Sequence, residues 1–508
     1  MSARVQSIIS SGVSGMVVDI ECHLSNNLPN IIIVGFANKS VGEARERIRG
    51  AFATSRIMLP RKRITVNLAP ADIPKADSGF DLAIAMSILL AGEQIAVESV
   101  SAEQAFISEL GLDGGTRAVR GIIGKLLAGR AKGLSTFYIP TANLRQAQLV
   151  PNVRLLPVGS LQELYLHLAG VKPIEIIDTV GGKYSPAINT PVNATVQLSE
   201  IAGQEQAKRA LEIAAAGGHN LFFNGPPGTG KSMLAKALPS LLPPLSREEV
   251  LEVTQLHSLA SQDYEKIITE RPFRSPHHSA SQAAVIGGGQ PLRPGEISLA
   301  HRGILFFDEL PEFGRPTLEA LRQPLEDRVI SVARAQENVE YPANFILVAT
   351  ANPCPCGYYA GGGTCKCQEY QVIQYARRLS GPIMDRVDLC TPVHDVKYAK
   401  LLKQKIDQQS DNDAAGRVYQ ARQRQAARYK RNDKLNADMT NADIKRRGKL
   451  VKEAETLLNT GAQRYGLSAR AYMRTVKVAR TIADLESSTP ITSAHVSEAL
   501  AYRAQSRQ

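Results

Sequence analysis

The stretch NLFFNGPPGTGKSMLAKALPSLL, residues 220–242, decides the fold. An apolar run typical of a buried strand leads through a glycine-rich turn into a helical pattern, which is the setting of a P-loop. Its glycines let successive backbone N–H groups face a phosphate at a helix N-terminus. The motif comprises Gly225, Pro226, Pro227, Gly228, Thr229, Gly230, Lys231 and Ser232. It predicts an ATP site in which Lys231 reaches the β- and γ-phosphates and Ser232 ligates Mg²⁺.

Two further apolar strands end in polar side chains. The first, GILFFDE at 303–309, ends in Asp308 and Glu309. Open α/β sheets bind ligands at the carboxyl ends of their strands, so both acids are expected beside the P-loop. Asp308 is expected to hold Mg²⁺, and Glu309 to polarise the attacking water. The second strand, NFILVATAN, ends in Asn352, whose amide is suited to align that water. Together these strands predict ATP hydrolysis rather than binding alone.

These motifs, in this order, resemble the AAA+ ATPases, with Asn352 at the sensor 1 position. The segment GPIMDRVDL at 381–389 is similar to the arginine-finger segment of the magnesium-chelatase and MCM-helicase branch, and SAR at 468–470 is similar to its sensor 2. The resemblance implies that Arg386 stabilises the γ-phosphate of a neighbouring subunit and that Arg470 contacts the same phosphate. It therefore implies a homo-hexameric ring. Ordinary surface roles are the alternative for both arginines.

The whole chain is expected to contain four blocks. These are a first domain at 1–170, a Pro-, Gly- and Thr-rich linker at 171–197, an α/β ATPase core at 198–395 and a basic, all-α lid at 396–508. The alternation of strands and helices in the core is typical of an open α/β sheet. The fold class expected is therefore α/β, an AAA+ P-loop ATPase module with a helical lid behind an α+β domain.

Two segments of the core resemble channel-facing features of the chelatase and helicase branch. The excursion 254–297 is similar to the helix-2 insert, and the segment 329–341 is similar to the pre-sensor hairpin. Such hairpins grip nucleic acid in the helicase members, which implies a DNA contact for Arg334. A charge that protects a sheet edge is the alternative for this residue.

The first domain resembles the Lon-protease fold in GLDGG at 111–115, GKLLAGRAKG at 124–133 and the strand 136–140. Lon-type proteolysis needs a nucleophilic Ser and a Lys base. Here Ile123 stands where the Lys is expected and Ser78 is offset from the nucleophile position. The domain is therefore expected to be a degenerate, non-proteolytic member of that fold.

This order of domains resembles the YifB/ComM family of bacterial Mg-chelatase-like ATPases. The resemblance implies a DNA motor that promotes branch migration in homologous recombination during natural transformation, with recombination proteins as possible partners. A chelatase-like ATPase that remodels a protein partner for metal insertion is the alternative. The missing Ser/Lys pair argues against a third hypothesis, an ATP-dependent protease.

Four of the six cysteines form two C-x-C pairs, Cys354 with Cys356 and Cys365 with Cys367. In a cytosolic chain, four clustered thiolates beside turn glycines favour a closed, structural Zn²⁺ site. The spacing departs from the usual C-x₂₋₄-C pattern. Four reduced thiols or a redox-labile pair are the alternatives.

Charge and composition bear on the partner. Lys and Arg number 60 against 48 Asp and Glu, and residues 421–452 alone hold eleven Lys/Arg against three Asp. Such a surplus suits a DNA backbone, read without base specificity through Arg446, Arg447 and Lys449, although a solvated helix face explains it equally simply. No Trp and 5% aromatic residues argue against a stacking platform for single-stranded bases. With no apolar stretch long enough for a membrane span and no secretory signal, a cytoplasmic protein is expected.

Overall fold

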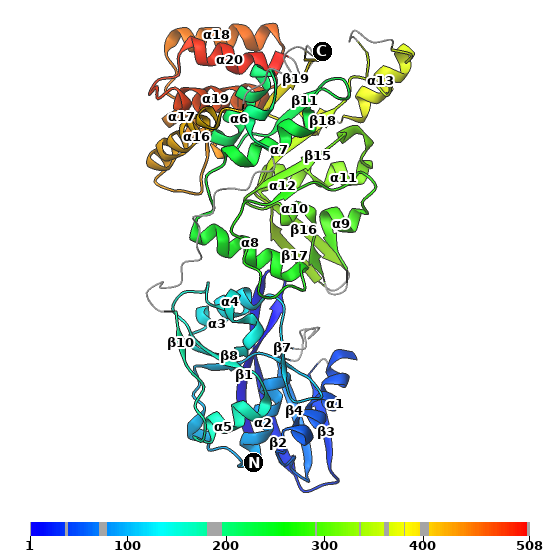
Figure 1. Ribbon diagram of the computed structural model, residues 1–508, viewed down its shortest axis with the longest axis vertical. Helices are drawn as coiled ribbons and strands as arrows, with labels where there is room; N and C mark the ends of the chain where they lie inside the picture. The colour runs from blue at the N-terminus through cyan, green and yellow to red at the C-terminus, as the bar shows by residue number, and fades with distance from the viewer. Residues whose placement is uncertain are drawn as a thin grey trace.

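The structure is a computed structural model of the 508-residue chain. It describes residues 2–35, 39–70, 79–179, 196–289, 292–334, 337–359, 365–379, 381–396 and 406–504. The molecule is elongated, with the N-terminal domain at one end, the P-loop core in the middle and the C-terminal helices at the other end (Figure 1). Among the described residues, no helix is both long and apolar enough to cross a membrane.

The N-terminal domain is built on one mixed sheet in the order β10-β9-β8-β5-β1-β2-β4-β3. Its strands are β1 (Ser2–Ser11), β2 (Ser14–Ser25), β3 (Asn30–Val34), β4 (Arg63–Ala69), β5 (Gln104–Phe106), β8 (Thr136–Pro140), β9 (Arg154–Val158) and β10 (Ile177–Asp178), and β6 (Glu109–Leu110) pairs with β7 (Thr116–Arg117). Its helices are α1 (Lys39–Thr54), α2 (Asp81–Ala91), α3 (Ile122–Ala131), α4 (Leu144–Ala147) and α5 (Leu161–Leu168). Every residue of α2 is buried, which explains why its sequence is apolar on all sides.

The expected linker begins too early at residue 171. Strand β10 pairs with β9, and the Thr179 hydroxyl donates to the Val153 carbonyl at 2.9 Å. Residues 171–179 therefore still belong to the first domain, and 180–195 lie outside the described residues. A two-residue edge strand is too short to produce an alternating pattern, so sequence periodicity cannot reveal it.

The core sheet has the order β12-β15-β18-β11-β19, and all its pairings are parallel. The strands are β11 (Leu221–Asn224), β12 (Phe273–Arg274), β15 (Ile304–Phe307), β18 (Ile346–Ala351) and β19 (Leu389–Pro392). Helices on both faces bury these strands, which is why they read as continuous apolar runs. The other elements are α6 (Glu205–Gly217), α7 (Lys231–Leu241), α8 (Arg247–Ala260), α11 (Arg315–Ala320), α12 (Arg322–Asp327), β16 (Val329–Arg334), β17 (Glu337–Pro342), α13 (Glu369–Arg378) and α14 (Gly381–Met384).

The excursion expected at 254–297 is not an insert throughout. It contains β12, a strand of the core sheet that pairs with β15. The part beyond β12 forms α9 (Gln282–Ile286), the short β13 (Gly287–Gly288) and β14 (Arg293–Pro294) pair, and α10 (Glu296–Leu299), and it buries Val285 and Ile297 in the core. The segment at 329–341 forms the antiparallel β16–β17 pair, as its sequence predicts.

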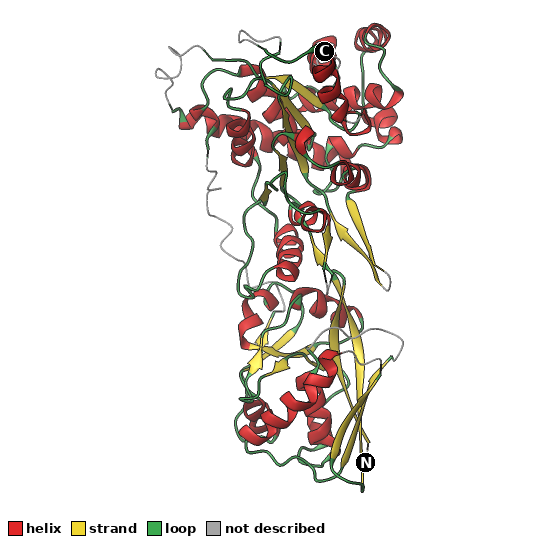
Figure 2. Ribbon diagram, turned by 90° about the vertical axis from the view of Figure 1, so that its right-hand side faces the viewer, coloured by secondary structure: helices red, strands yellow, loops and turns green. Residues whose placement is uncertain are grey.

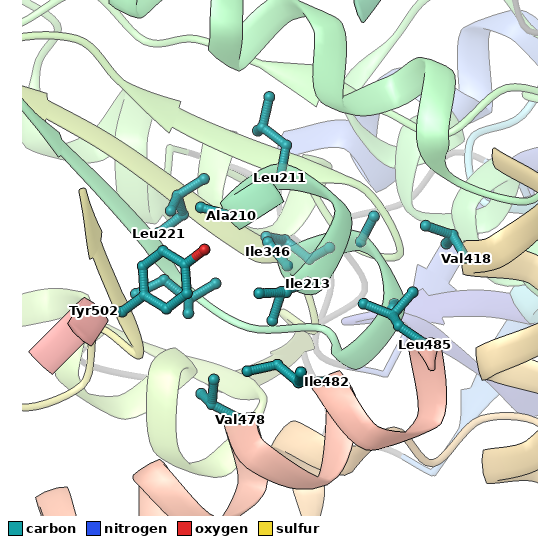
Figure 3. Close-up of a cluster of buried hydrophobic side chains, with 14 of the residues drawn as sticks. Ala210, Leu211, Ile213, Leu221, Ile346, Val418, Val478, Ile482, Leu485 and Tyr502 are labelled. Atoms are coloured by element: carbon teal, nitrogen blue, oxygen red, sulfur yellow. The ribbon is translucent and has the colours of Figure 1, made fainter. Parts of the chain in front are cut away.

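The C-terminal helices share a hydrophobic core with the sheet domain. They are α16 (Gln408–Tyr429), α17 (Asn441–Arg447), α18 (Lys452–Arg464), α19 (Ala469–Leu485) and α20 (Ser493–Ala504). Leu211 and Ile213 of α6 belong to one buried cluster with Ile482 and Leu485 of α19 and Tyr502 of α20, and Figure 3 shows Ile213 on the side of α6 that faces α19. Because this cluster is continuous, the lid is anchored to the helix that precedes the P-loop strand.

The N-terminal domain also packs directly on the core. Val250 and Val253 of α8 lie in one buried cluster with Ile122 of α3, and the Gln255 side chain donates to the Val13 carbonyl at 2.6 Å. The β1–β2 turn lies against the β16–β17 hairpin, as Figure 2 makes visible from the side. The two domains are thus joined through side-chain contacts as well as through the chain.

Candidate active site

The P-loop connects β11 to α7, and its backbone explains its glycines. Gly228 and Gly230 have φ values of +81° and +89°, and a Cβ built on either would meet nothing within 4 Å. Residues other than glycine rarely adopt this left-handed conformation. The loop therefore offers open space beside backbone N–H groups at the start of α7, where a phosphate chain fits.

Lys231 lies between the P-loop and the end of β18. Its ammonium donates to the carbonyls of Gly225 at 2.5 Å and Pro226 at 2.7 Å, and to Asn352 Oδ1 at 2.9 Å. Burial lowers the pKa of Lys231, while the negative charges of Asp308 and Glu309 oppose that shift. Three predicted site residues, Gly225, Pro226 and Asn352, thus accept hydrogen bonds from the Lys231 ammonium.

Ser232 and Asp308 form an oxygen pair suited to a divalent cation. Ser232 Oγ donates to Asp308 Oδ2 at 3.0 Å, and Thr350 Oγ1 donates to Asp308 Oδ1 at 2.7 Å. Mg²⁺ prefers oxygen ligands and commonly takes only one or two from the protein, with water and phosphate oxygens completing its shell. These residues therefore fit a Mg²⁺ ion that accompanies a nucleotide in the P-loop.

Glu309 lies beside this pair in a restrained conformation. Its φ is +53°, and its backbone N–H donates to Thr350 Oγ1 at 2.9 Å. Asn352 Nδ2 donates to Glu309 Oε1 at 3.3 Å. Two predicted residues thus meet, and Thr350, which the sequence analysis did not select, supports both acids. Its only sequence signal is a hydroxyl in an otherwise apolar buried strand.

Arg386 and Arg470 lie together, but at the amino ends of the core strands, whereas the P-loop lies at their carboxyl ends. The Arg386 guanidinium forms an ion pair with Glu326 of α12, and Arg470 Nη2 lies 3.4 Å from Glu326 Oε1. Both arginines line a cavity of about 860 Å³ that also includes Asn220, directly before β11. The P-loop follows β11, whose four residues span about 13 Å. This strand length separates the two arginines from the P-loop of their own chain.

A buried ion network fixes Arg386's segment to the lid. Asp388 accepts from Arg474 Nη1 at 2.8 Å and lies 3.2 Å from His219 Nδ1. Although burial opposes ionisation, Arg474 and His219 hold the pKa of Asp388 well below its usual value. Arg474 Nη1 also donates to the Arg386 carbonyl at 2.9 Å. Neither this network nor Glu326 had a recognisable sequence signal.

Comparisons with known proteins show the family of this chain. Models of the magnesium chelatase subunit ChlI match residues 197–401, 20–143 and, for its C-terminal part, 408–503. YifB of Escherichia coli (strain K12) is 42% identical over 98% of this chain and 96% of its own length. Competence protein ComM of Haemophilus influenzae is 41% identical over 99% and 98%. The chain belongs to the YifB/ComM family of Mg-chelatase-like proteins.

Membership confirms the family resemblance and the coarse fold. A mixed α/β core followed by a helical C-terminal region is the architecture of this Mg-chelatase-like AAA+ family. A more distant relative, the magnesium-chelatase 38 kDa subunit of Rhodobacter capsulatus, is 30% identical over 31% of this chain and 50% of its own length.

The cysteines of this YifB/ComM-family chain converge directly after Asn352. The Sγ atoms of Cys354, Cys356, Cys365 and Cys367 all lie within 4.8 Å of one another. Cys354 Sγ is 3.3 Å from Cys356 Sγ and 3.8 Å from Cys365 Sγ. The two C-x-C pairs therefore form one cluster.

Three of the eleven basic residues at 421–452 have a structural role. Arg422 donates to the Ala215 carbonyl, Arg424 donates to the Asp484 carbonyl, and Arg428 donates to the Asp484 carboxylate. These three therefore hold α16 to its neighbours and are not available as a phosphate-binding surface.

The predicted DNA contacts differ in their surroundings. Arg446 and Lys449 are exposed, whereas Arg447 is half-buried, 3.5 Å from Asp443 and 5.3 Å from the centre of the Tyr429 ring. Arg334 ends β16, and its side chain lies outside the described residues.

Proposed function

We propose that this chain is an ATPase whose hydrolysis drives movement along DNA. The observation that carries the proposal is the meeting of Glu309 and Asn352 beside the Ser232–Asp308 pair. A protein that only bound ATP would need the P-loop and the Mg²⁺ ligands. A carboxylate oriented by an amide beside them supplies what hydrolysis adds, a base for the attacking water. Bound Mg²⁺ would neutralise charge on the phosphates.

The active form in this proposal is a homo-hexameric ring. Arg386 and Arg470 are held together by Glu326, but they lie at the amino ends of the core strands, opposite the carboxyl ends where their own P-loop lies. Two adjacent cations so placed suit the γ-phosphate bound by a neighbouring subunit, where they would stabilise transition-state charge. Glu326 would keep both guanidinium groups in position before the subunits meet.

The substrate we propose is branched or duplex DNA, with branch migration in homologous recombination as the outcome and natural transformation as the setting. The name of the Haemophilus influenzae relative, a competence protein, supports this setting. Arg446 and Lys449, exposed on the lid, and Arg334, at the end of β16, are the proposed backbone contacts, with Arg447 beside them. Recombination proteins are the further partners, and the cytoplasm is the location.

The domain roles follow from the same proposal. The first domain would be a degenerate Lon-protease-like module, since Ile123 is buried inside α3 and offers no base, while Ser78 lies outside the described residues. The P-loop core and lid would form the motor. Zn²⁺ would occupy the four-cysteine cluster.

A second candidate is a chelatase-like ATPase that remodels a protein partner for metal insertion. It is favoured by the match to magnesium chelatase models over the P-loop core. DNA dependence separates the two candidates.

The test measures ATP hydrolysis by the purified full-length chain with and without branched and linear duplex DNA. We expect DNA to raise the turnover rate severalfold at low salt. Lys231→Ala should abolish turnover and nucleotide binding, whereas Glu309→Gln should bind ATP without turning it over. Turnover near the wild-type rate in Glu309→Gln would refute the assigned base, and DNA-independent hydrolysis would favour the chelatase-like candidate.

A further inference from the structure

We propose that the four-cysteine cluster is a Zn²⁺-held brace for the P-loop, so that metal occupancy sets the affinity for nucleotide. The inference deepens the ATPase and zinc assignments above and rests on both. It concerns four cysteines that are not among the predicted phosphate and Mg²⁺ ligands.

The sulfur positions fit a single tetrahedral ion. Zn–S bonds of about 2.3 Å place the sulfurs of a regular tetrahedron about 3.8 Å apart. The separations here are 3.3 Å for Cys354–Cys356, 3.8 Å for Cys354–Cys365 and 3.5 Å for Cys356–Cys365. With Cys367 as the fourth thiolate, no position is left open, which is the pattern of a structural rather than a catalytic zinc.

The turn that contains the first two cysteines, Cys354 to Gly357, lies against the P-loop. Gly357 N–H donates to the Cys354 carbonyl at 2.9 Å, which closes the turn. Gly357 has a φ of +88°, and a Cβ built on it would lie 2.6 Å from Pro227 Cδ and 3.0 Å from Pro227 Cγ. The backbone of the cysteine turn therefore packs directly on the P-loop, at a distance that leaves no room for a side chain.

The same turn is continuous with the end of β18. Asn352, two residues before Cys354, bonds the Lys231 ammonium, and the Ala351 carbonyl accepts from Gly225 N–H at 3.3 Å. Cys354 is fully buried. The first C-x-C pair is thus fixed to the P-loop both through the chain and through Pro227.

The second C-x-C pair leads into α13, which is attached elsewhere. Arg378 of α13 lies 3.4 Å from Glu312 Oε2, three residues after Glu309, and Tyr375 is buried. An ion bound by both pairs therefore ties the P-loop side of the site to the segment that follows the catalytic acids. Without the ion, the two pairs are no longer tied to each other, so the Pro227 contact and the Lys231–Asn352 hydrogen bond should loosen.

The experiment uses full-length protein with its affinity tag removed, because a tag can bind metal. Metal content is measured by mass spectrometry, and nucleotide affinity by titration with a fluorescent ATP analogue. We expect about one zinc per chain. The double variant Cys365→Ser/Cys367→Ser should lose the zinc and bind the analogue roughly tenfold more weakly, the factor that corresponds to about 1.4 kcal/mol.

Gly357→Ala tests whether zinc acts on nucleotide affinity through the contact with the P-loop or only by stabilising the protein elsewhere. It keeps all four thiolates but pushes into Pro227, so it should retain zinc and still weaken nucleotide binding severalfold. Gly133→Ala, also at a positive φ of +90° but with nothing within 4 Å of its added Cβ, is the matched control and should change neither quantity.

Chelation followed by return of zinc tests the wild-type chain in the same way, and the lost affinity should come back with the metal. Absence of zinc, iron in its place, or wild-type affinity in the zinc-free protein would overturn the proposal. Wild-type affinity in Gly357→Ala would overturn the Pro227 contact as its route. Failure of DNA to stimulate hydrolysis would contradict the DNA motor while leaving these binding results unaffected.

Discussion

Thr350 is expected to position the catalytic acids, and Thr350→Val tests this with almost no change of shape. The threonine side chain is fully buried, and its hydroxyl accepts from Glu309 N–H while donating to Asp308 Oδ1. Valine leaves both groups without this partner. A buried polar group that loses its partner costs about 1–3 kcal/mol. If one such loss is felt in the transition state, kcat falls about 5- to 150-fold.

The assay is steady-state ATP hydrolysis with Mg²⁺, together with ATP binding. Binding should stay nearly unchanged, because the Lys231 contacts do not involve Thr350. Thr350→Ser is the matched control, since it keeps the hydroxyl and loses one methyl group, worth about 0.8 kcal/mol. Its kcat should stay within about fourfold of wild type. A Thr350→Val enzyme as active as Thr350→Ser would refute the positioning role.

Three further outcomes are expected. Arg386→Ala should retain ATP binding but lose hydrolysis. Mixing it with Lys231→Ala should restore activity, because a mixed ring can pair an intact P-loop with an intact Arg386 from the neighbouring subunit. No restoration in rings shown to mix would contradict an arginine finger acting in trans. Neutralising Arg446, Arg447 and Lys449 should flatten the salt dependence of DNA affinity, whose log–log slope is about −0.9 per phosphate contact, with DNA-free hydrolysis retained; an unchanged slope would move the contact to the hairpins. Glu252, hydrogen-bonded to His301 and Arg302, has its pKa lowered to about 2, so its contribution to stability is present above about pH 4.5 and is lost as pH falls towards 2. Glu252→Gln should reduce the fall in melting temperature over that range, and an identical fall in both proteins would exclude this carboxylate as its source.

The motifs that the sequence identified are local, and their physical basis is local as well. A glycine-rich turn between strand and helix specifies its own backbone path, so Gly225 to Ser232 could be placed before any packing was known. Asp308 and Asn352 follow buried strands, and the carboxyl ends of parallel strands share one edge of a sheet. Their convergence on Ser232 and Lys231 was predictable for that reason.

The boundaries of domains and inserts, and the residues that support the site, were harder to predict from the sequence. Strands β10 and β12 have two residues each, too few for a periodic pattern, so the sequence pattern places β10 in a linker and β12 in an insert. Charge counts likewise could not distinguish Arg422, which holds the lid to α6, from Arg446, which faces solvent. Only the partner of each side chain makes that distinction.

The sequence by itself determined the family, the nucleotide chemistry and the four thiols available to a metal, because each depends on residue types at short, fixed spacing. Tertiary structure decided that Thr350 joins the two acids, that Glu326 gathers Arg386 and Arg470, and that the cysteine turn rests on Pro227. Each of these pairs residues from separate elements. Such pairings arise from how strands and helices pack, and no local pattern in the chain encodes them.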